Sequence, residues 1–404
     1  MKKILFVIDS LTLGGAEKSL VTLLNLMDYS RYDVDLLLFS QGGAFQALLP
    51  KEVKLLPVPE YFAYNAVPWS DLPEKIKHPR MLLSQLRYSA ALRMGKHNHI
   101  EKAVLLWESC RNCFREMEQV YDTAIAYAQG VPTFFVAEKV QAKKKAAWIN
   151  AIYIPTGRYL SYILPFYKKF DTVNAVSESV AGQMQETFGI PDKKVMVMKD
   201  ILDAEFAVKM ANMPSEVSRD MAGSGTKILT VGRFAAMKGY DLAIGAAKIL
   251  RDQEFPFTWY VIGDGALRGE LEQQIRDAGL QDRFILLGSR VNPYPYFAAC
   301  DLYVQSSRFE GFGITLAEAK MFHKPIVTTN FDAVGAQFKN EKNGLIVDIS
   351  PQAIADGILR MERDEDLRRR CVANVRAEKK GNPEEIEKLY AMIENVLPSR
   401  RGDN

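Results

Sequence analysis

Cysteine is scarce in this sequence, with four residues among 404, which excludes a disulfide-dense secreted scaffold. Cys110 and Cys113 form one Cys-x-x-Cys pair without the second pair that a four-ligand zinc site would need. Long apolar runs are also lacking, since none approaches the roughly 18–20 residues of a membrane-spanning helix. The apolar run 4–8 ends at Asp9 and is too short for a signal-peptide core. We therefore expect a cytoplasmic protein with reduced thiols.

An excess of charge of one sign is lacking too. The sequence has 52 Lys and Arg against 49 Asp and Glu, a formal net charge of +3. This balance argues against a polycationic nucleic-acid binder, so we expect no nucleic-acid partner. A hydrophobic fraction of 48% is typical of globular proteins. At about 150 residues per domain, the chain is long enough for two or three domains.

Short apolar runs alternate with helical stretches through both halves of the chain. The predicted strands are residues 4–8, 34–39, 123–127, 227–231, 259–262, 284–287, 302–305 and 326–329. Strands that alternate with helices predict parallel sheets covered by helices on both faces. Because the cycle restarts near residue 227, we expect an α/β protein with two Rossmann-like, doubly wound domains that face each other across a cleft.

The predicted first domain is residues 1–205 and the second is residues 206–382. The polar, turn-rich segment 212–226 is typical of a linker. A C-terminal helix, about 383–404, is expected to pack back on the first domain. Residues 60–120 fit the alternation poorly, and we expect an insertion or lid there.

One segment, Ser307–Ala319 (SRFEGFGITLAEA), follows a predicted strand and opens a predicted helix. It therefore lies where ligands bind in open α/β sheets, at the carboxyl ends of strands. Gly311 and Gly313 permit close backbone approach to a ligand. The free N–H groups of the first helical turn, around Gly313, Ile314 and Thr315, favour an anion because the helix dipole reinforces them.

Glu310 lies before that first helical turn, and Glu318 lies about one and a half turns further along the helix. A carboxylate can accept two hydrogen bonds from neighbouring hydroxyls, so each residue suits a vicinal diol of a sugar or ribose. The alternative stays open that Glu310 is a loop charge and that Glu318 serves the helix dipole.

Two cations and two further loops favour a phosphate-containing ligand. Arg233 and Lys238 share one strand-to-helix loop, and two fixed cations beside a helix N-terminus can hold a diphosphate without a metal. The turn Gly14–Gly15 follows the first strand and lets the backbone reach a phosphate. The loop 263–265 (GDG) also follows a strand, although a plain turn explains it equally well.

Together these motifs resemble glycosyltransferase family 4. The resemblance is carried by VGRF…KGYD (231–241), GDG (263–265), LGSRVNPYPYF (287–297), GGAE (14–17) and the Glu310–Glu318 pair. It covers nearly the whole chain and is most specific over 227–345. It implies the GT-B architecture and a retaining, metal-independent transfer without a cofactor. The donor would be a nucleotide-sugar, namely a UDP-sugar, and the acceptor a glycan or lipid-linked saccharide of surface polysaccharide biosynthesis.

The resemblance also implies roles for single residues. Those assigned to catalysis are Glu310, Arg233 and Lys238. Those assigned to the donor diphosphate are Gly15, Arg233, Lys238, Gly313, Ile314 and Thr315. Those assigned to the donor sugar are Glu310, Gly311, Phe312 and Asn150. Glu318 would bind the ribose, and Ser289, Arg290 and Val291 would meet the base.

The chain departs from the family's pattern at two positions. Asn150 stands where the family usually has His near the donor sugar, so a changed donor preference is expected. Asp200 stands where the family commonly has Asn. Two other functions stay open: a nucleotide-sugar epimerase of the same fold, and a non-catalytic GT-B subunit that binds a partner transferase.

Several other charged motifs have ordinary structural explanations. We expect the Asp-x-Asp pairs at 33–35 and 364–366 to be structural, and His97 and His99 to lie in a solvated loop. Lys139 and Lys143–Lys145, with the aromatic run 159–167, could form a patch at the inner face of the plasma membrane. The alternative, a solvated helix face over core aromatics, stays open.

Overall fold

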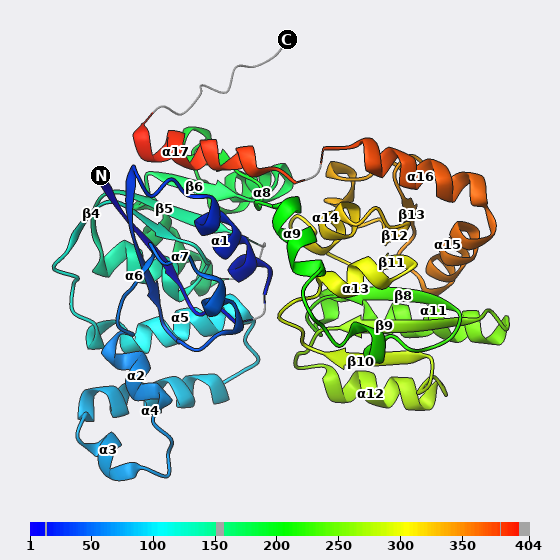
Figure 1. The fold of residues 1–404 in the computed structure, drawn as a ribbon. Helices are drawn as coiled ribbons and strands as arrows, with labels where there is room; N and C mark the ends of the chain where they lie inside the picture. Colours follow the sequence, from blue (N-terminus) through cyan, green and yellow to red (C-terminus); the bar gives the residue numbers. More distant parts are fainter. Residues whose placement is uncertain (13, 151–156, 380, 396–404) are drawn as a thin grey trace. The chain divides into compact units, whose positions relative to one another are not determined.

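The computed structural model describes residues 1–12, 14–150, 157–379 and 381–395. The chain divides into two compact units, here called unit 1 (Met1–Asp200 with Glu384–Asn404) and unit 2 (Ile201–Pro383). Figure 1 shows the two units, each with its own sheet. The segment 212–226, which its composition suggested as a linker, belongs to unit 2.

Unit 1 is built on a seven-stranded parallel sheet in the order β3-β2-β1-β4-β5-β6-β7. The strands are β1 Lys2–Ile8, β2 Tyr32–Leu38, β3 Lys54–Leu55, β4 Val120–Ala126, β5 Gln141–Ile149, β6 Thr172–Ala175 and β7 Val195–Val197. Residues 4–7 of β1 are fully buried, as expected for a central strand that is apolar on both faces. The chain reverses its direction of winding between β1 and β4.

The helices of unit 1 are α1 Gly15–Leu26, α2 Glu60–Ala66, α3 Leu72–Ile76, α4 Pro79–Arg93, α5 His99–Cys110, α6 Val131–Lys139, α7 Arg158–Lys168, α8 Glu178–Phe188 and α17 Ile386–Glu394. The C-terminal helix α17 packs on unit 1, where the Tyr390 ring stacks on the Tyr32 ring with centroids 5.2 Å apart. Lys388 Nζ also donates to the carbonyl of Val197 at 3.1 Å.

The irregular region after β3 folds as α2, α3 and α4 ahead of α5. We call residues 60–96 the insertion; Figure 1 shows it beyond α5, at the lower left. Its aromatic residues anchor it, because Tyr61 and Phe62 pack against Phe114, with ring centroids 5.5 and 5.4 Å apart. Helix α5 then begins with a capping box formed by Asn98 and Glu101.

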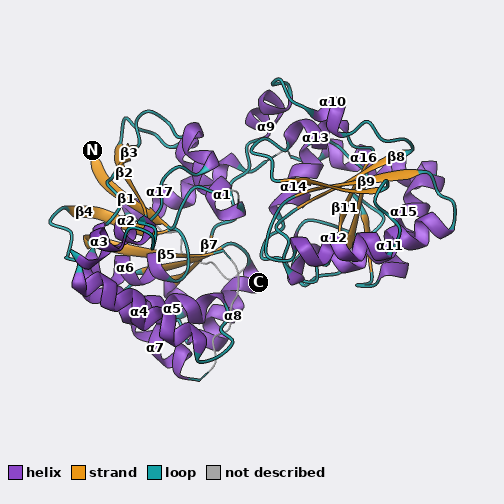
Figure 2. Ribbon diagram, turned by 90° about the horizontal axis from the view of Figure 1, so that it is seen from below, coloured by secondary structure: helices purple, strands orange, loops and turns teal. Residues whose placement is uncertain are grey.

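Unit 2 has a six-stranded parallel sheet in the order β10-β9-β8-β11-β12-β13. The strands are β8 Thr226–Val231, β9 Phe257–Ile262, β10 Phe284–Gly288, β11 Leu302–Gln305, β12 Ile326–Thr329 and β13 Leu345–Val347. The helices are α9 Ala204–Ala211, α10 Val217–Asp220, α11 Tyr240–Asp252, α12 Arg268–Asp277, α13 Tyr294–Ala299, α14 Ile314–Met321, α15 Pro351–Arg363 and α16 Glu365–Ala377. Figure 2 shows α11, α12 and α15 on one side of this sheet and α9, α10 and α13 on the other.

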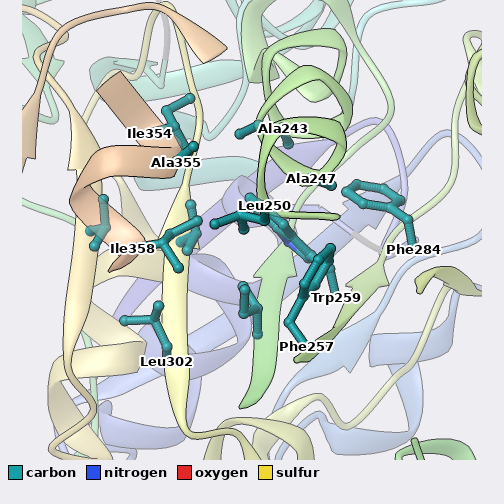
Figure 3. Close-up of a cluster of buried hydrophobic side chains, with 14 of the residues drawn as sticks. Ala243, Ala247, Leu250, Phe257, Trp259, Phe284, Leu302, Ile354, Ala355 and Ile358 are labelled. Carbon is teal, nitrogen blue, oxygen red and sulfur yellow. The ribbon is translucent and has the colours of Figure 1, made fainter. Parts of the chain in front are cut away.

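The core of unit 2 lies between its sheet and the helices α11 and α15. Figure 3 shows Ala243, Ala247 and Leu250 of α11 beside Ile354 and Ile358 of α15, above strand residues such as Trp259. Small residues on α11 let it approach α15 and the sheet closely. Two parallel sheets covered by helices confirm the predicted α/β class with two Rossmann-like domains. None of the described helices is both long enough and apolar enough to cross a bilayer.

Candidate functional site

The predicted donor-binding residues of unit 2 lie at one edge of its sheet, whereas Gly15 and Asn150 belong to unit 1. The strand order reverses between β8 and β11, and parallel strands place their carboxyl ends at the same edge. Arg233 and Lys238 follow β8, the base loop 289–291 follows β10, and Glu310 follows β11. The 263–265 loop follows β9, so four neighbouring strands deliver predicted residues to this edge.

The loops after β8 and β11 are locked together. Gly239, at the start of α11, has φ +63°, and a Cβ there would lie 2.1 Å from the carbonyl oxygen of Ser306. Only glycine fits this approach. Ser306 Oγ donates to the carbonyl of Lys238 at 2.9 Å. Arg308 donates to both carboxylate oxygens of Asp241, at 2.7 and 2.6 Å, and thereby holds the pKa of Asp241 below its ordinary value.

Lys238 and Glu310 form an ion pair at the centre of this edge. Lys238 Nζ lies 2.7 Å from Oε1 and 2.8 Å from Oε2 of Glu310. The two side chains are only 18% and 9% exposed, so the attraction is screened less than on an open surface. Arg233, by contrast, is exposed and makes no ion pair with any described residue. This edge therefore carries the Lys238–Glu310 ion pair, whose charges neutralise each other, and the exposed cation Arg233.

A buried glutamine that the sequence analysis did not single out holds Glu310 in place. Gln305, the last residue of β11, donates through Nε2 to Glu310 Oε1 at 2.6 Å and to Ser307 Oγ at 2.7 Å. Its Oε1 accepts from the Tyr303 hydroxyl at 2.6 Å and from Thr315 Oγ1 at 3.2 Å. Ser307 Oγ also donates to Glu310 Oε1, at 2.6 Å. The amide thus uses both donors and its acceptor oxygen, which fixes its orientation.

The predicted anion site is the start of α14. Gly313 is the N-cap residue, and no side-chain cap occupies the first turn. Gln337 donates from its side chain to the carbonyls of Phe312 and Gly313, which fixes the loop that enters the helix. Ile314 and Thr315, in the first turn, are half-buried. The orphan N–H groups of this turn favour a negatively charged ligand.

Glu318 lies deeper than its predicted ribose contact suggests. It is 1% exposed, and its Oε1 accepts from the Tyr294 hydroxyl at 3.3 Å. Burial and the neighbouring Glu318 carboxylate raise the pKa of Tyr294 well above its ordinary value. The ribose role of Glu318 stays a prediction, and Tyr294 is a partner that the sequence analysis did not identify.

The predicted base loop is held by a carboxylate from the supposed linker. Arg290 Nη2 lies 2.8 Å from Asp220 Oδ2, and the Tyr296 hydroxyl donates to the same oxygen at 2.6 Å. Arg290 Nε also donates to the Tyr296 hydroxyl at 2.9 Å. Although burial raises the pKa of Asp220, the hydrogen bonds from Tyr296 and Arg290 hold it below its ordinary value. Ser289 and Val291 are exposed on either side of this clamp.

The predicted residues of unit 1 lie at the carboxyl edge of its own sheet. Gly15 is the first residue of α1, after β1, and Asn150 directly follows β5. Asn150 Nδ2 donates to the carbonyl of Tyr127 at 2.9 Å, whereas its buried Oδ1 has no partner among the described residues. The Tyr127 ring stacks on Trp148 with centroids 4.8 Å apart. The hydrogen bond to Tyr127 therefore fixes the orientation of the Asn150 amide, and Asn150 Oδ1 remains without a partner among the described residues.

Asp200, the last residue of the first segment of unit 1, is 5% exposed. Burial raises the pKa of this carboxyl to about 6, although a hydrogen bond with Ser19 opposes the shift. The Ser19 hydroxyl also lies 3.0 Å from the Tyr127 hydroxyl, within hydrogen-bond distance. Asp200 therefore shares a buried polar cluster with Ser19 and Tyr127.

One residue of each predicted acidic pair has a structural hydrogen bond. Asp35 accepts from the Tyr121 hydroxyl at 2.8 Å, and Asp364 caps α16 by accepting from the N–H of Leu367 at 2.9 Å. Within the described residues, no group of three or more His, Cys, Asp or Glu is placed to hold a metal ion. His97 is not a solvated loop residue, because its Nδ1 lies 3.2 Å from the Tyr159 hydroxyl and its side chain is 13% exposed.

Lys143–Lys145 of the predicted basic and aromatic patch have partners within unit 1, although the side chain of Lys143 is 74% exposed. Lys144 donates to the carbonyls of Met392 and Ile393, and Lys145 donates to the carbonyl of Ala137. Lys143 pairs with Asp122 at 2.7 Å. Of the aromatic run, Phe166 and Tyr167 are buried. These lysines lie on β5, and their partners belong to strand β4 and to helices α6 and α17.

Comparisons with known proteins agree with this geometry. Residues 218–378 match the family model described as "Glycosyl transferases group 1". The chain is 24% identical over 378 residues to N-acetylgalactosamine-N,N'-diacetylbacillosaminyl-diphospho-undecaprenol 4-alpha-N-acetylgalactosaminyltransferase of Campylobacter jejuni, covering 91% of this chain and 92% of that protein. It is 30% identical over 215 residues to alpha-D-kanosaminyltransferase of Streptomyces kanamyceticus, covering 51% of this chain and 55% of that protein.

Solved structures show the same fold at lower identity. The crystal structure of Alr3699/HepE of Anabaena in complex with UDP and glucose has a TM-score of 0.70, at 20% identity, covering 98% of this chain and all of that one. The structure of a mutant of S. aureus TarM in complex with Fondaparinux, alpha-GlcNAc-glycerol and UDP has a TM-score of 0.68, at 14% identity, covering 98% of this chain and 100% of that one. At these identities, the likeness shows a shared two-domain architecture.

Proposed function

We propose that this chain, a glycosyltransferase with a group 1 domain at residues 218–378, moves a sugar from a UDP-sugar to a saccharide acceptor with retention of anomeric configuration. This assigns it to glycosyltransferase family 4. The observation that carries the proposal is the carboxyl edge of the unit 2 sheet, where Lys238 pairs with Glu310 and Gln305 links Glu310 to Thr315 in the first turn of α14. Arg233 follows β8 at the same edge. Cations beside a helix N-terminus suit a diphosphate, and a fixed carboxylate suits sugar hydroxyls.

Lys238 can serve both Glu310 and the diphosphate. An ammonium group has three N–H donors, and the two hydrogen bonds to Glu310 leave one for a phosphate oxygen. Arg233, which is exposed, adds a second cation with a planar fork of donors. A departing diphosphate gains negative charge, and preorganised donors aimed at such charge are each worth about 3 kcal/mol. No metal ion is needed for this stabilisation.

Glu310 is suited to orient the donor sugar. Its Oε1 accepts from Lys238, Gln305 and Ser307, whereas among the described residues only Lys238 donates to Oε2. The lone pairs left on Oε2 can accept from hydroxyls of the sugar. The incoming acceptor hydroxyl would then attack from the side that the diphosphate leaves, and a phosphate oxygen would take its proton. This reaction retains the anomeric configuration and needs no side-chain nucleophile.

The acceptor is proposed to bind unit 1 and to be a lipid-linked saccharide. The Campylobacter relative carries a diphospho-undecaprenol acceptor in its name. Asn150 of unit 1, which the resemblance assigns to the donor sugar, has a buried amide oxygen without a partner among the described residues, and this oxygen can accept from a hydroxyl of that sugar. An acceptor of this kind would place the protein in the cytoplasm, at the inner face of the plasma membrane.

A nucleotide titration tests the donor site. UDP, GDP and ADP would be titrated by calorimetry, each with and without EDTA, into the wild type and into Lys238→Ala and Arg233→Ala. We expect UDP to bind most tightly, with no effect of EDTA, and each variant to weaken binding at least tenfold. Lys248→Ala is the matched control, because Lys248 is exposed on the same helix that follows Lys238.

Two outcomes would contradict the proposal. Failure of all three nucleotides to bind would favour a non-catalytic subunit that keeps the fold. Conversion of a UDP-sugar without an acceptor would instead assign an epimerase. NMR of the glycoside formed from a UDP-sugar tests the stereochemistry, and an inverted anomeric centre would exclude the retaining mechanism.

A further inference from the structure

Large apolar side chains are exposed on the insertion. Of the twelve strongly exposed large hydrophobic residues in the described chain, six lie between residues 69 and 94: Trp69, Leu72, Ile76, Leu83, Leu86 and Met94. Leu72 and Ile76 are one turn apart on α3, and Leu83 and Leu86 share the outer face of α4. Apolar residues gathered on one element of a surface mark an interaction site rather than chance exposure.

The same outer face of α4 carries arginines. Arg80, Arg87 and Arg93 are exposed at helical spacings that place them beside Leu83 and Leu86. None of the three arginines forms an ion pair with another described residue. Between residues 75 and 100 the sequence has six Lys or Arg and no Asp or Glu. This face therefore combines apolar and cationic side chains without acidic ones.

The acidic residues nearby are already used within the insertion. Asp71 caps α3 by accepting from the N–H of Glu74, and Glu74 pairs with Lys77 at 2.6 Å. Lys75 is buried, and its Nζ lies 5.0 Å from the centre of the Trp69 ring, a cation–π contact. That contact holds the Trp69 ring in place although the residue is 54% exposed.

We infer that this surface of the insertion, formed by α3 and α4 with Trp69, docks on an anionic lipid bilayer. Basic residues interleaved with leucines on one helix face, with a tryptophan beside them, suit the boundary between headgroups and acyl chains. The cations are attracted to anionic headgroups, and the leucines and Trp69 enter the acyl boundary. In both ribbon views α4 lies against α5, on the far side from the sheet (Figures 1 and 2).

This inference rests on the proposed function and makes it more specific. A lipid-linked acceptor stays in its membrane, so a transferase without a spanning helix among its described residues needs a docking surface. The insertion takes the role that the sequence analysis gave to Lys143–Lys145, whose side chains have partners inside unit 1.

Trp69 is a built-in reporter of docking. The other three tryptophans, Trp107, Trp148 and Trp259, are at most 1% exposed. Vesicles of phosphatidylcholine mixed with phosphatidylglycerol would be added to the whole protein, and tryptophan emission and its quenching by iodide would be recorded. We expect a blue shift and protection from iodide, both lost in Trp69→Phe and both absent with phosphatidylcholine alone. An unchanged emission with both vesicles would overturn the inference.

Co-sedimentation with the same vesicles measures the contribution of the leucines and that of the arginines separately. We expect at least tenfold weaker binding for Leu83→Ser with Leu86→Ser, and for the triple change Arg80→Gln, Arg87→Gln and Arg93→Gln. The matched controls are Val208→Ser with Met213→Ser, and Arg363→Gln with Arg369→Gln, which change exposed residues of unit 2. Docking variants that bind vesicles like the wild type would overturn the inference.

UDP titration of the wild type and of every variant distinguishes failure of the docking surface from failure of the proposed donor site. Wild type that binds UDP but not vesicles contradicts the docking surface alone. Wild type that binds vesicles but not UDP contradicts the donor site alone. The arginine triple variant guards against misfolding of the leucine variant, because its changes are confined to exposed side chains.

Discussion

The two sheet edges that carry the predicted residues differ in chemistry although they share a topology. Each sheet reverses its strand order, between β1 and β4 in unit 1 and between β8 and β11 in unit 2. The unit 2 edge is held by ion pairs, including Lys238–Glu310 and Arg290–Asp220. Around the unit 1 edge, Asn150 and Tyr127 are instead held by amide and hydroxyl hydrogen bonds and by ring stacking.

This difference suits two kinds of ligand. A multiply charged diphosphate needs charges that are already fixed, because reorienting them during the reaction would cost free energy. A saccharide is uncharged and is recognised through hydroxyls and apolar ring faces, which amides and aromatic rings match. We therefore expect unit 2 to hold most of the donor and unit 1 to bind the acceptor saccharide, and the following changes test this expectation.

The largest expected effect is on catalysis at the charged edge. Glu310→Gln keeps the shape of the side chain but removes the charge that pairs with Lys238. We expect kcat to fall by about 10²–10³-fold, the size typical of losing one preorganised electrostatic contact. The affinity for UDP, measured by calorimetry, should change by less than about fivefold, because UDP lacks the sugar. A kcat within a few-fold of wild type would remove Glu310 from the catalytic residues.

The second prediction concerns stability at the unit 1 edge, where Asp200 is buried. Burial raises the pKa of Asp200 from an ordinary 3.8 to about 6, so the charged form is disfavoured in the folded state. The stability that Asp200 contributes is therefore complete below about pH 4 and is lost as the pH rises through 6. At pH 7.5 the charged carboxylate costs roughly 3 kcal/mol by this shift. Asp200→Asn should stabilise unit 1 by up to that amount at pH 7.5 and by little at pH 4.

Urea unfolding at the two pH values measures this effect. The exposed Asp282→Asn is the control, because an exposed carboxyl should show no such difference between pH 4 and pH 7.5. Equal stabilities of wild type and Asp200→Asn at pH 7.5 would contradict the raised pKa. A more stable Asp200→Asn variant would show that the chain tolerates a destabilising carboxylate at a position where glycosyltransferase family 4, which the sequence resembles, commonly has Asn.

The sequence was sufficient to place the charged edge but not to show how it is held. Strand–helix alternation puts the loops after β8, β10 and β11 on one edge, so Arg233, Lys238 and Glu310 could be predicted together. Gln305 and Asp220 could not, because their partners are chosen by packing between distant segments. The only local signal for Gln305 was a polar residue at the end of an apolar strand.

Composition could not show the partners of two further segments, for the same reason. The segment 212–226 is polar and turn-rich, yet Asp220 within it clamps Arg290 in unit 2. The run Lys143–Lys145 has the charge of a membrane patch, yet backbone carbonyls of helices α17 and α6 accept hydrogen bonds from Lys144 and Lys145. A local pattern reports the character of a segment and not the neighbours that the fold brings to it.

The third prediction tests whether Gln305 acts through Glu310. Gln305→Leu keeps a similar volume but removes the donor to Glu310 Oε1 and leaves the Tyr303 hydroxyl without its acceptor. We expect kcat to fall by about 10–100-fold while KM for the donor changes little, because the contact orients the carboxylate rather than binding substrate. Gln305→Glu separates positioning from packing, since it restores the shape but places a second negative charge beside Glu310. A loss for Leu that Glu reverses would contradict the positioning role.

The smallest expected effect is at the base loop, where the ion pair lies at the end of the charged edge. Tyr296→Phe removes one of the hydrogen bonds to Asp220 and one to Arg290 without opening a cavity. A hydrogen bond to a charged group contributes about 1.5–3 kcal/mol, but the remaining Arg290–Asp220 contact retains part of the loop order. We therefore expect UDP to bind about three- to tenfold more weakly in calorimetry, with kcat unchanged at saturating donor.

Asp220→Asn, which leaves Arg290 without its counter-charge, should lower the affinity for UDP more than Tyr296→Phe does. Equal affinities of both variants and the wild type would show that the loop is positioned by its backbone alone, and the ion pairs of unit 2 would then serve the diphosphate and the sugar but not the base.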